Sequence, residues 1–292
     1  MNRIAVIVVT YNRIELLKEC IDSIRNQTFS SYSIIVVNNG STDSTAEWLL
    51  EQTDVITITQ ENVGGAGGFF TGIKYACEHG YEYSWIMDDD VIVTPNALQN
   101  LIDATLYGNG FICSRVVDVQ GNNCNVPKIS NAKSETTGEP IWGQYIACGL
   151  LRTDITSFVS VLLPSRIVYE LGLPHSEYFI WGDDTEYTSR ISAKYPSYMA
   201  INSIVIHKRK ISSVLSIFTE EDPGRIRNYF YAYRNRIHNQ KKVYRKILLF
   251  VYSLYEGLRL LFRRKYYACF IVLKGTLASV FFHPTIKFPS EC

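Results

Sequence analysis

The first hundred residues alternate between short apolar runs and longer segments with helical spacing, and this alternation limits the possible folds more than any other feature. The apolar runs, which predict buried strands, cover residues 4–9, 34–37, 55–59 and 83–87. The predicted helices cover residues 14–26, a stretch around 48–50 that Ser41 or Thr42 caps, residues 68–78 and residues 95–106. Strands that alternate with helices form right-handed βαβ units with a parallel sheet. The sequence therefore predicts an α/β fold with a Rossmann-like, mostly parallel central sheet flanked by helices.

The rest of the chain divides into a less regular part and a basic tail. The pattern is weak over residues 110–153, with a polar loop around 121–138, and it mixes strand and helix signals over 155–173. A turn at 181–182 leads into an acid-rich helix, and then a strand at 199–207 and a basic helix at 225–239 are predicted. One or two C-terminal amphipathic helices follow over 246–282. We expect one domain over residues 1–240 and a basic amphipathic segment over 241–292.

Composition argues against several classes of protein. A hydrophobic content of 47% in 292 residues supports one large domain with an appendage, and a net charge of +1 gives no general attraction to nucleic acid. The seven cysteines are odd in number and form no CxxC pair, so we expect free thiols rather than disulfides or a zinc site. The first apolar run is too short for a signal peptide, and no run of about eighteen uncharged apolar residues predicts a transmembrane helix.

Polar or glycine-rich loops follow each of the four predicted strands. They cover residues 10–13, 38–43, 60–68 and 88–90. The carboxyl ends of parallel strands meet at one edge of a sheet, and ligands bind beyond that edge. The four loops therefore predict one binding site there, and their coincidence is stronger support than any single loop.

Three consecutive carboxylates, those of Asp88, Asp89 and Asp90, follow the fourth apolar run. Adjacent carboxylates repel one another and lose hydration at the edge of a sheet. A divalent cation that carries a phosphate would offset this cost, because hard cations such as Mg²⁺ and Mn²⁺ prefer carboxylate oxygen. The alternative is an acidic loop in which one aspartate caps the following helix.

The glycine-rich loop contains Gly64, Gly65, Gly67 and Gly68, and it precedes a predicted helix. Glycine permits positive φ angles and a close approach of ligands to the backbone. N–H groups at the start of a helix bind phosphate, so the loop is a candidate diphosphate site. Alone, such a run is also compatible with a flexible turn. The nearby aspartates favour a diphosphate that bridges the glycine N–H groups and a metal ion.

Two further candidate sites are a pair of aspartates at the start of a predicted helix and a histidine at the end of a predicted strand. Asp183 and Asp184 follow Trp181 at the start of the acid-rich helix, and a carboxylate in reach of a hydroxyl group can act as a general base. The alternative is a helix N-terminus that carries acids because they interact favourably with the helix dipole. His207 ends a predicted strand, where a histidine more often has a purely structural role.

The charge of the tail is almost entirely positive. Residues 225–274 contain thirteen lysines and arginines and a single acid, Glu256. Leucine, tyrosine and phenylalanine residues lie among these charges, which is typical of a segment that binds an anionic membrane surface. The alternatives are a helix pair that packs on the domain and a contact in a homo-oligomer. Arginines among aromatic residues also occur on RNA-binding surfaces, but no nucleic-acid motif is present.

Five motifs occur in an order that resembles the family 2 inverting glycosyltransferases with the GT-A fold. They are VVTYNR at 8–13, VVNNGSTD at 36–43, NVGGAGGF at 62–69, DDD at 88–90 and WGDDTEY at 181–187. Each motif alone is moderately specific, whereas the ordered set is highly specific. The resemblance covers about residues 3–240, and it implies a GT-A domain that transfers a sugar from a nucleotide sugar with the help of Mn²⁺ or Mg²⁺.

The resemblance also implies a role for each motif residue. The loops with Thr10, Tyr11, Asn12, Arg13, Asn38 and Asn39 hold the nucleotide base and ribose, and the diphosphate lies against Asn62, Gly64, Gly65, Gly67 and Gly68. Asp88 and Asp90 are the metal-binding pair of the DXD motif, Asp89 contacts the sugar or ribose, and His207 completes the metal shell. Asp184 is the general base, Asp183 binds acceptor hydroxyl groups, and Trp181 offers an apolar platform to a sugar ring. The family often has Asp where this chain has Asn38 or Asn39, and an amide still pairs with a uracil edge.

The glycine-rich motif resembles galactofuranosyltransferases more than the NxGxAxGxN form of rhamnosyl and glucosyl relatives. It predicts UDP-galactofuranose as the donor. The predicted acceptor is a glycan or lipid-linked glycan of a bacterial surface polysaccharide such as O-antigen. We expect the protein to be cytoplasmic and peripherally bound to the inner face of the plasma membrane. The alternatives are a rhamnosyltransferase that uses dTDP-rhamnose and a catalytically silent subunit of a polysaccharide assembly complex. A glycoside hydrolase, which two acidic centres also suggest, has no use for the glycine-rich loop or the basic tail.

Overall fold

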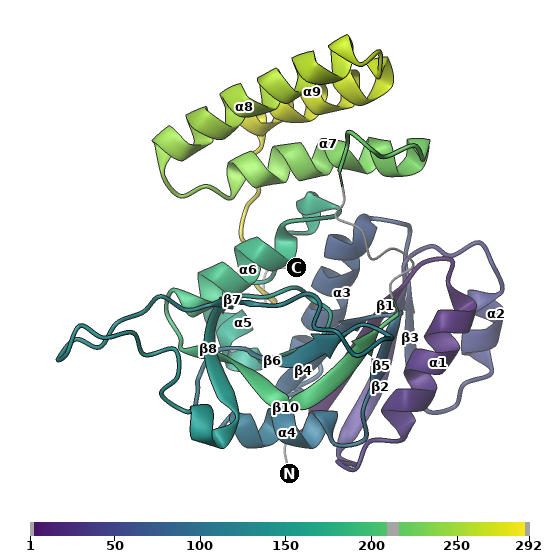
Figure 1. Ribbon diagram of the computed structural model, residues 1–292. Helices are drawn as coiled ribbons and strands as arrows, with labels where there is room; N and C mark the ends of the chain where they lie inside the picture. The colour runs from purple at the N-terminus through teal and green to yellow at the C-terminus, as the bar shows by residue number, and fades with distance from the viewer. Residues whose placement is uncertain (1–2, 209–215, 290–292) are drawn as a thin grey trace.

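The computed structural model describes residues 3–208 and 216–289. Helices cover both faces of one central sheet, and three further helices form a layer beyond α6 (Figure 1). Within these residues the strands are β1 Ile4–Thr10, β2 Tyr32–Asn38, β3 Val55–Thr59, β4 Tyr83–Asp88, β5 Val91–Val93, β6 Ile112–Val117, β7 Lys128–Ile129, β8 Leu150–Ile155, β9 Val161–Pro164 and β10 Ser197–His207. The α-helices of the same ranges are α1 Ile14–Arg25, α2 Thr45–Leu50, α3 Gly64–Glu78, α4 Ala97–Ala104, α5 Ser165–Leu171, α6 Asp183–Ser192, α7 Pro223–His238, α8 Val243–Phe262 and α9 Tyr266–Phe281.

The strands follow the order β3-β2-β1-β4-β9-β6-β10-β8-β7, and β5 pairs with β10. The pairs β1–β2, β1–β4, β2–β3 and β6–β10 are parallel, and they contain most of the paired residues. β9 lies antiparallel between β4 and β6, and β8 is antiparallel to β10. This arrangement confirms the predicted α/β fold with a mostly parallel central sheet flanked by helices. The antiparallel pairings in the second half of the domain were not predicted.

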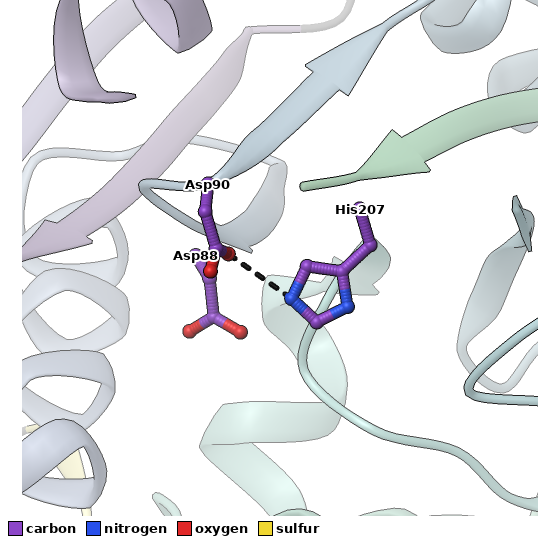
Figure 2. Close-up of side chains that lie close together, drawn as sticks. All are labelled: Asp88, Asp90 and His207. Carbon is purple, nitrogen blue, oxygen red and sulfur yellow. Dashed lines mark ion pairs between the residues drawn. The ribbon is translucent and has the colours of Figure 1, made fainter. Parts of the chain in front are cut away.

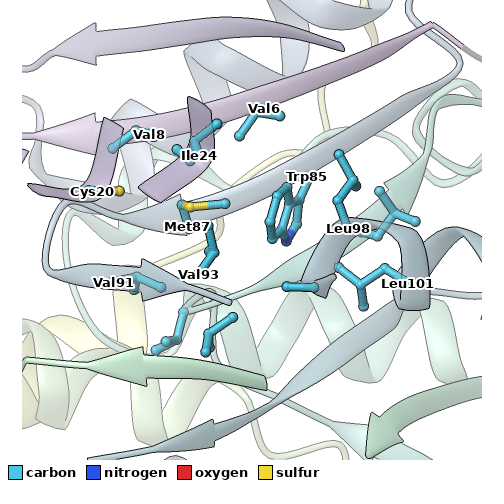
Figure 3. Packing of buried hydrophobic residues seen from close by; sticks show 14 of the residues in the cluster. Val6, Val8, Cys20, Ile24, Trp85, Met87, Val91, Val93, Leu98 and Leu101 are labelled. Carbon is cyan, nitrogen blue, oxygen red and sulfur yellow. The ribbon is translucent and has the colours of Figure 1, made fainter. Parts of the chain in front are cut away.

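The core lies on both faces of the sheet, and β1 contributes to both halves. Val6 and Val8 belong to the half on the side of α1, with Ile24, Trp85 and Met87 (Figure 3). The alternate residues of β1 belong to the half on the side of α3. A strand buried on both faces needs apolar side chains at every position, which explains the uninterrupted apolar sequence of β1.

α3 lies close to β1 because two of its glycines face the strand. A Cβ atom on Gly68 would lie 2.4 Å from Val9 Cγ1, and a Cβ atom on Gly72 would lie 2.4 Å from Ile7 Cγ2. Such distances are far below van der Waals contact, so a side chain at either position would push the helix away from the sheet. Gly68 therefore serves helix packing.

Several details of the predicted elements are wrong. α3 begins at Gly64, so the glycine-rich motif forms its first turns instead of an entry loop. α2 begins at Thr45, and neither Ser41 nor Thr42 caps it. Ser41 Oγ instead accepts a hydrogen bond from the Asn12 N–H at 3.0 Å, and the Thr42 N–H donates to Asn12 Oδ1 at 2.6 Å. The helix expected over 95–106 is the shorter α4, and the unpredicted strand β5 precedes it.

α7, α8 and α9 share a small hydrophobic core of their own. Ile226 and Tyr233 of α7 pack in this core with Leu260 of α8 and with Ile271 and Val272 of α9. α7 ends before residue 240, where the sequence predicts the end of the main domain, but it packs with α8 and α9, which follow that residue. The three helices therefore form one unit that includes residues from both sides of the predicted boundary. Among the helices described, none combines the length and the hydropathy that a membrane span requires.

Residues 282–289 return from α9 to the sheet domain. The Leu173 N–H donates a hydrogen bond to Lys287 O at 2.8 Å, and His175 Nδ1 lies 3.2 Å from Thr285 O. Gly172 has a φ of 80°, and a Cβ atom there would lie 2.2 Å from Ile286 Cγ2. The C-terminal segment therefore ties the helical layer to the domain.

Candidate active site

The candidate site lies at the carboxyl edge of the parallel strands, where the sequence predicts it. Thr10 and Asn38 are paired at the ends of β1 and β2, and Asp88 ends β4 on the other side of β1. Strand β5 then pairs antiparallel with β10, so that His207 lies opposite Val91. This register brings a histidine from late in the chain to the three aspartates after β4.

Asp88, Asp90 and His207 form a cluster in which one ligand atom of each residue lies within 4.8 Å of the others (Figure 2). His207 Nε2 is 3.0 Å from Asp90 Oδ1, and this oxygen is buried without a hydrogen bond of acceptable geometry. Two adjacent ligands of an octahedral ion with bonds of about 2.1 Å are separated by about 3.0 Å. The donor set and the spacing therefore fit Mg²⁺ or Mn²⁺, which carboxylate oxygens and imidazole bind.

The three aspartates differ in their electrostatic environment. Burial, together with the charges of Asp90 and Asp89, raises the pKa of Asp88 well above its usual value. Burial also acts to raise the pKa of Asp90, but the close contact with the His207 imidazole and the charge of Arg13 outweigh it and lower that pKa. The cluster thus concentrates carboxylate charge in a buried place, and a divalent cation would offset this cost.

Asp89 is held inside the protein by the first loop. Its Oδ2 accepts a hydrogen bond from Thr10 Oγ1 at 2.8 Å, and its Oδ1 lies 3.2 Å from Arg13 Nη1. The same Arg13 nitrogen is 3.0 Å from Asp90 Oδ2. Burial raises the pKa of Asp89 to about 6, although Arg13 acts against this. Both oxygens of Asp89 therefore contact protein groups and hold the first loop, and its contact with a sugar or ribose stays a prediction.

The asparagines of the nucleotide loops also make internal hydrogen bonds. Asn39 Oδ1 accepts from Gln60 Nε2 at 2.8 Å, and Asn39 Nδ2 donates to Gly64 O at 3.0 Å. Asn38 Oδ1 accepts from the Ser41 N–H at 3.1 Å. These amides shape the loops, and their predicted contacts with the base and ribose stay a prediction. Tyr11, at the rim, is an exposed side chain with 44% of its surface accessible.

The first turn of α3 lies against the segment around Phe179, which leads to Asp183 and Asp184, the second acidic centre of the site. Gly64 has a φ of 78°, and a Cβ atom there would lie 2.0 Å from Phe179 O. The Ala66 N–H donates to the same carbonyl oxygen at 3.1 Å. A Cβ atom on Gly67 would meet Val63 Cγ2 at 2.4 Å, but one on Gly65 would meet no heavy atom of the described residues within 4 Å. Of these glycines, only Gly65 leaves open space beside the site.

A strained turn carries the second acidic centre into the site. Phe179 and Trp181 have φ angles of 65° and 62°, which non-glycine residues rarely adopt, and Gly182 has a φ of 96°. Asn235 of α7 is fully buried, and its Nδ2 lies 3.1 Å from Tyr178 O and 2.7 Å from Trp181 O. The sequence analysis missed Asn235. Its only sequence signal is an amide among the basic residues of α7.

Asp183 and Asp184 begin α6 immediately after this turn. Burial, with the charge of Asp184, raises the pKa of Asp183 to about 8. Burial also raises the pKa of Asp184, whose Oδ1 accepts a hydrogen bond from the Thr185 N–H at 2.6 Å. The charge of Asp183 contributes to the raised pKa of Asp88, so the two acidic centres lie within electrostatic reach. Trp181 is partly buried and packs edge-on against Tyr229, with ring centroids 5.3 Å apart.

Comparisons with known proteins agree with this geometry. The model of the family described as "Glycosyl transferase family 2" matches residues 5–153, about half of the chain. The galactofuranosyltransferase GlfT1 of Mycobacterium tuberculosis is 24% identical over 254 residues, which are 79% of each chain. The glycosyltransferase GlyG of Streptococcus pneumoniae is 37% identical over 103 residues, which are 34% of this chain and 33% of GlyG.

Solved structures show the same fold. Residues 1–349 of S. aureus TarS superpose with a TM-score of 0.56 at 14% identity, over 99% of this chain and 97% of TarS 1–349. The complex of TarS 1–349 with UDP-GlcNAc gives a TM-score of 0.52 at 16% identity, over 80% of this chain and 67% of that chain. The motifs, the sheet and the family match thus confirm the resemblance seen in the sequence, and the chain belongs to glycosyl transferase family 2, as a glycosyltransferase with the GT-A fold.

Proposed function

We propose that the enzyme transfers galactofuranose from UDP-galactofuranose to a glycan or lipid-linked glycan acceptor, with inversion at the anomeric carbon and with Mn²⁺ or Mg²⁺ as cofactor. The observation that carries this proposal is the meeting of three features at one sheet edge. They are the cluster of Asp88, Asp90 and His207, the first turn of α3, and the acidic start of α6.

The residues of this edge suit the departure of a nucleoside diphosphate. Asp88, Asp90 and His207 would hold the metal ion, which would neutralise charge on the leaving diphosphate. At the start of α3 the N–H groups of Gly64 and Ala66 donate to Asn62 Oδ1 and Phe179 O, so the Gly65 N–H is the one that would bind a phosphate oxygen. Tyr11 and Asn12 at the end of β1 lie on the exposed side of the same edge, where the base and ribose would bind.

The acidic start of α6 suits activation of the acceptor. The acceptor hydroxyl oxygen would form a bond to the anomeric carbon while the bond from that carbon to the phosphate oxygen breaks. The hydroxyl proton would pass to the Asp184 carboxylate, and the electron pair of the broken bond would leave with the diphosphate. Asp184 is partly exposed, whereas Asp183 is buried, so Asp184 is the better placed of the two to meet an acceptor. Asp183 and Trp181 would bind the acceptor sugar.

The donor assignment has two supports. The relative GlfT1 is named a galactofuranosyltransferase, and the glycine-rich motif has the form seen in such enzymes. Gly65 and Gly67 are the glycines by which this motif differs from the NxGxAxGxN form, and a missing side chain there could leave room for a furanose ring. Val63, however, occupies the space beside Gly67. Gly65 alone provides that room.

A donor assay tests the proposal. The purified chain would be offered UDP-galactofuranose, dTDP-rhamnose and UDP-GlcNAc, with Mn²⁺ or with a chelator, and release of the nucleoside diphosphate would be measured. We expect release from UDP-galactofuranose that requires the metal. Turnover of dTDP-rhamnose alone would make the enzyme a rhamnosyltransferase, and no turnover of any donor would favour a silent subunit of an assembly complex.

The Asp184→Asn variant tests the base within the same assay. Asparagine has the same shape and its Oδ1 still accepts a hydrogen bond from the Thr185 N–H, so α6 keeps its start. We expect UDP and Mn²⁺ to bind this variant as they bind the wild type. Turnover with the true acceptor should fall by about 10²–10⁴-fold, the usual effect of a lost general base. Near-normal kcat would move the role to Asp183.

The enzyme would act at the inner face of the plasma membrane, on which α8 and α9 would lie. The side chains that α8 buries against the other helices are Ser253, Glu256, Gly257 and Leu260, of which only one is large and apolar. Its exposed side chains include ten large apolar residues, among them Ile247, Leu248 and Phe262. Figure 1 shows that α8 and α9 form the outermost layer of the molecule, beyond α7. A large exposed apolar surface is typical of a membrane or protein contact site.

A further inference from the structure

Asn125 lies behind His207, on the side of the imidazole ring opposite the aspartates. It comes from the loop between β6 and β7, and its Oδ1 is 3.1 Å from His207 Nδ1. On the other side of the amide, Nδ2 lies 3.3 Å from Ser157 Oγ and donates to it, so that Oδ1 faces the histidine. Asn125 has a φ of 46°, in the left-handed region that asparagine tolerates better than most residues. The loop therefore holds this amide in a defined orientation.

The orientation of Asn125 determines the tautomer of His207. An amide oxygen only accepts hydrogen bonds, so His207 Nδ1 must carry a proton and donate it. In a neutral imidazole the lone pair is then on Nε2, which faces Asp90 Oδ1 at 3.0 Å. An ionised carboxylate oxygen is also only an acceptor, so two electron-rich atoms face each other over a short distance. A cation shared by the two atoms, either a proton on Nε2 or a divalent metal ion, would offset their repulsion.

We propose that Asn125 is a positioning residue, which keeps His207 in the Nδ1–H tautomer so that Nε2 can bind a divalent cation together with Asp90. This inference rests on the metal dependence proposed above. A carbonyl-type acceptor behind a metal-binding histidine fixes its ring and raises its basicity, and loss of such a partner typically weakens metal binding 10–100-fold. Asn125 belongs to none of the sequence motifs, and only the topology brings it to His207.

Two substitutions at the same position separate the acceptor from the backbone conformation. In Asn125→Gly the positive φ remains easy, but the acceptor is lost. In Asn125→Asp an acceptor oxygen remains, and aspartate also tolerates this conformation. Asn123→Gly is the matched control, because Asn123 lies on the same loop and its Oδ1 accepts from Arg115 Nε at 2.8 Å, away from His207. Thermal unfolding of the metal-free variants would verify that each folds.

The measurement is calorimetric titration of Mn²⁺ into the full chain in the presence of UDP. We expect Asn125→Gly to weaken Mn²⁺ binding about 10–100-fold, while Asn125→Asp and Asn123→Gly stay within a few-fold of the wild type. A ¹⁵N spectrum of histidine-labelled protein with Mg²⁺ should also show the Nδ1–H tautomer of His207 in the wild type and its loss in Asn125→Gly.

Three results would overturn the proposal, and they are distinguishable. If the wild type binds Mn²⁺ and Asn125→Gly binds it equally well, Asn125 does not position His207. If Asn125→Asp loses affinity as much as Asn125→Gly, the acceptor is not what matters. If the wild type itself binds no Mn²⁺ with UDP, both this inference and the proposed metal dependence fail, and the contact between His207 and Asp90 is a plain ion pair.

Discussion

Three consecutive aspartates, the last residue of β4 and the two residues of the turn before β5, have different surroundings. Burial and the neighbouring carboxylates raise the pKa of Asp88, Asp89 accepts hydrogen bonds from Thr10 and Arg13, and Asp90 lies against His207. The same residue type is therefore a ligand candidate at two positions and a brace at the third. The sequence identifies the acidic cluster, but only the tertiary contacts assign a task to each member.

The residue with the clearest consequence for pH is Asp183. Its pKa is raised to about 8 by burial and by Asp184, against a usual value near 3.8. Between these values the folded protein binds more protons than the unfolded chain. Stability therefore falls as pH rises from about 4 to about 8. The Asp183→Asn variant lacks this titration, so it should unfold at a higher temperature than the wild type at pH 8.5.

Metal-free protein is the right sample for this comparison, because a bound cation would change the charges around Asp88. Each pKa unit corresponds to about 1.4 kcal/mol, so the gain at pH 8.5 should exceed about 1 kcal/mol even if coupling to Asp184 takes part of it. At pH 4.5 the difference between wild type and variant should be much smaller, because most of the pH range over which it develops lies above that value. A variant that is less stable than the wild type at both pH values would show that the Asp183 carboxylate is ionised and well paired.

At the scale of elements, the strands that are buried on both faces could be predicted from the sequence, whereas the short strands could not. β1 to β4 were predictable because the parallel strands carry apolar runs bounded by polar loops. β5, β7 and β9 have two to four residues each, and their antiparallel partners come from distant parts of the chain. No local pattern encodes such pairings. The start of α3 was misplaced for a related reason, since glycines in a first helical turn read as a loop unless the contact with Phe179 is known.

Adjacent glycines at the start of α3 provide a matched pair for a test. Gly64→Ala should lower stability by more than about 1 kcal/mol, because the φ is positive and the new Cβ meets Phe179 O. Gly65→Ala should leave stability within about 0.5 kcal/mol, since the site of its Cβ is open and alanine favours helix. It should instead weaken donor binding, because the methyl group enters the space proposed for the sugar diphosphate.

Thermal unfolding and calorimetric titration of UDP-galactofuranose measure the two effects separately. The prediction for Gly65 is contradicted if the alanine variant binds the donor like the wild type. In that case the donor lies elsewhere, and the room beside Gly65 carries no information on its ring size. Equal stability of the two alanine variants would contradict the close contact between α3 and the Phe179 turn.

At the scale of the whole molecule, the layer of α7, α8 and α9 contacts the candidate active site through the turn before Asp183. Asn235 of α7 holds carbonyl groups of the turn before Asp183, and Asn239 Nδ2 donates to Gly182 O at 2.8 Å. The return of residues 282–289 to Leu173 closes the connection. These contacts join single polar residues to backbone groups far away in sequence, so no motif predicts them. A chain that ends at residue 239 would also expose the apolar face of α7.

The outward face of α8 has an apolar centre between two basic ends. Ile247 and Val251 are 60% and 57% exposed, and residues 247–258 contain no charge except the buried Glu256. Basic residues occupy both ends, at 241–246 and 263–265. In a soluble helix the large apolar residues face the core, so the reversed arrangement predicts that this face lies on an anionic membrane. Each basic residue near such a surface contributes about 1 kcal/mol at low salt, and the apolar face adds a salt-insensitive part.

Point variants separate these two contributions while the helical core stays intact. The full chain should co-sediment with anionic vesicles at low salt and be released only in part at high salt. The combination of Ile247→Ser, Val251→Ser and Leu258→Ser should remove the salt-resistant part, because these exposed side chains are absent from the core shared with α7 and α9. As a control, Leu50→Ser on α2 removes a leucine that is even more exposed and should change nothing. The contrary outcome is that the wild type binds neither anionic nor neutral vesicles and sediments as a dimer, while the triple variant sediments as a monomer. In that case the face is a contact between two copies of the chain.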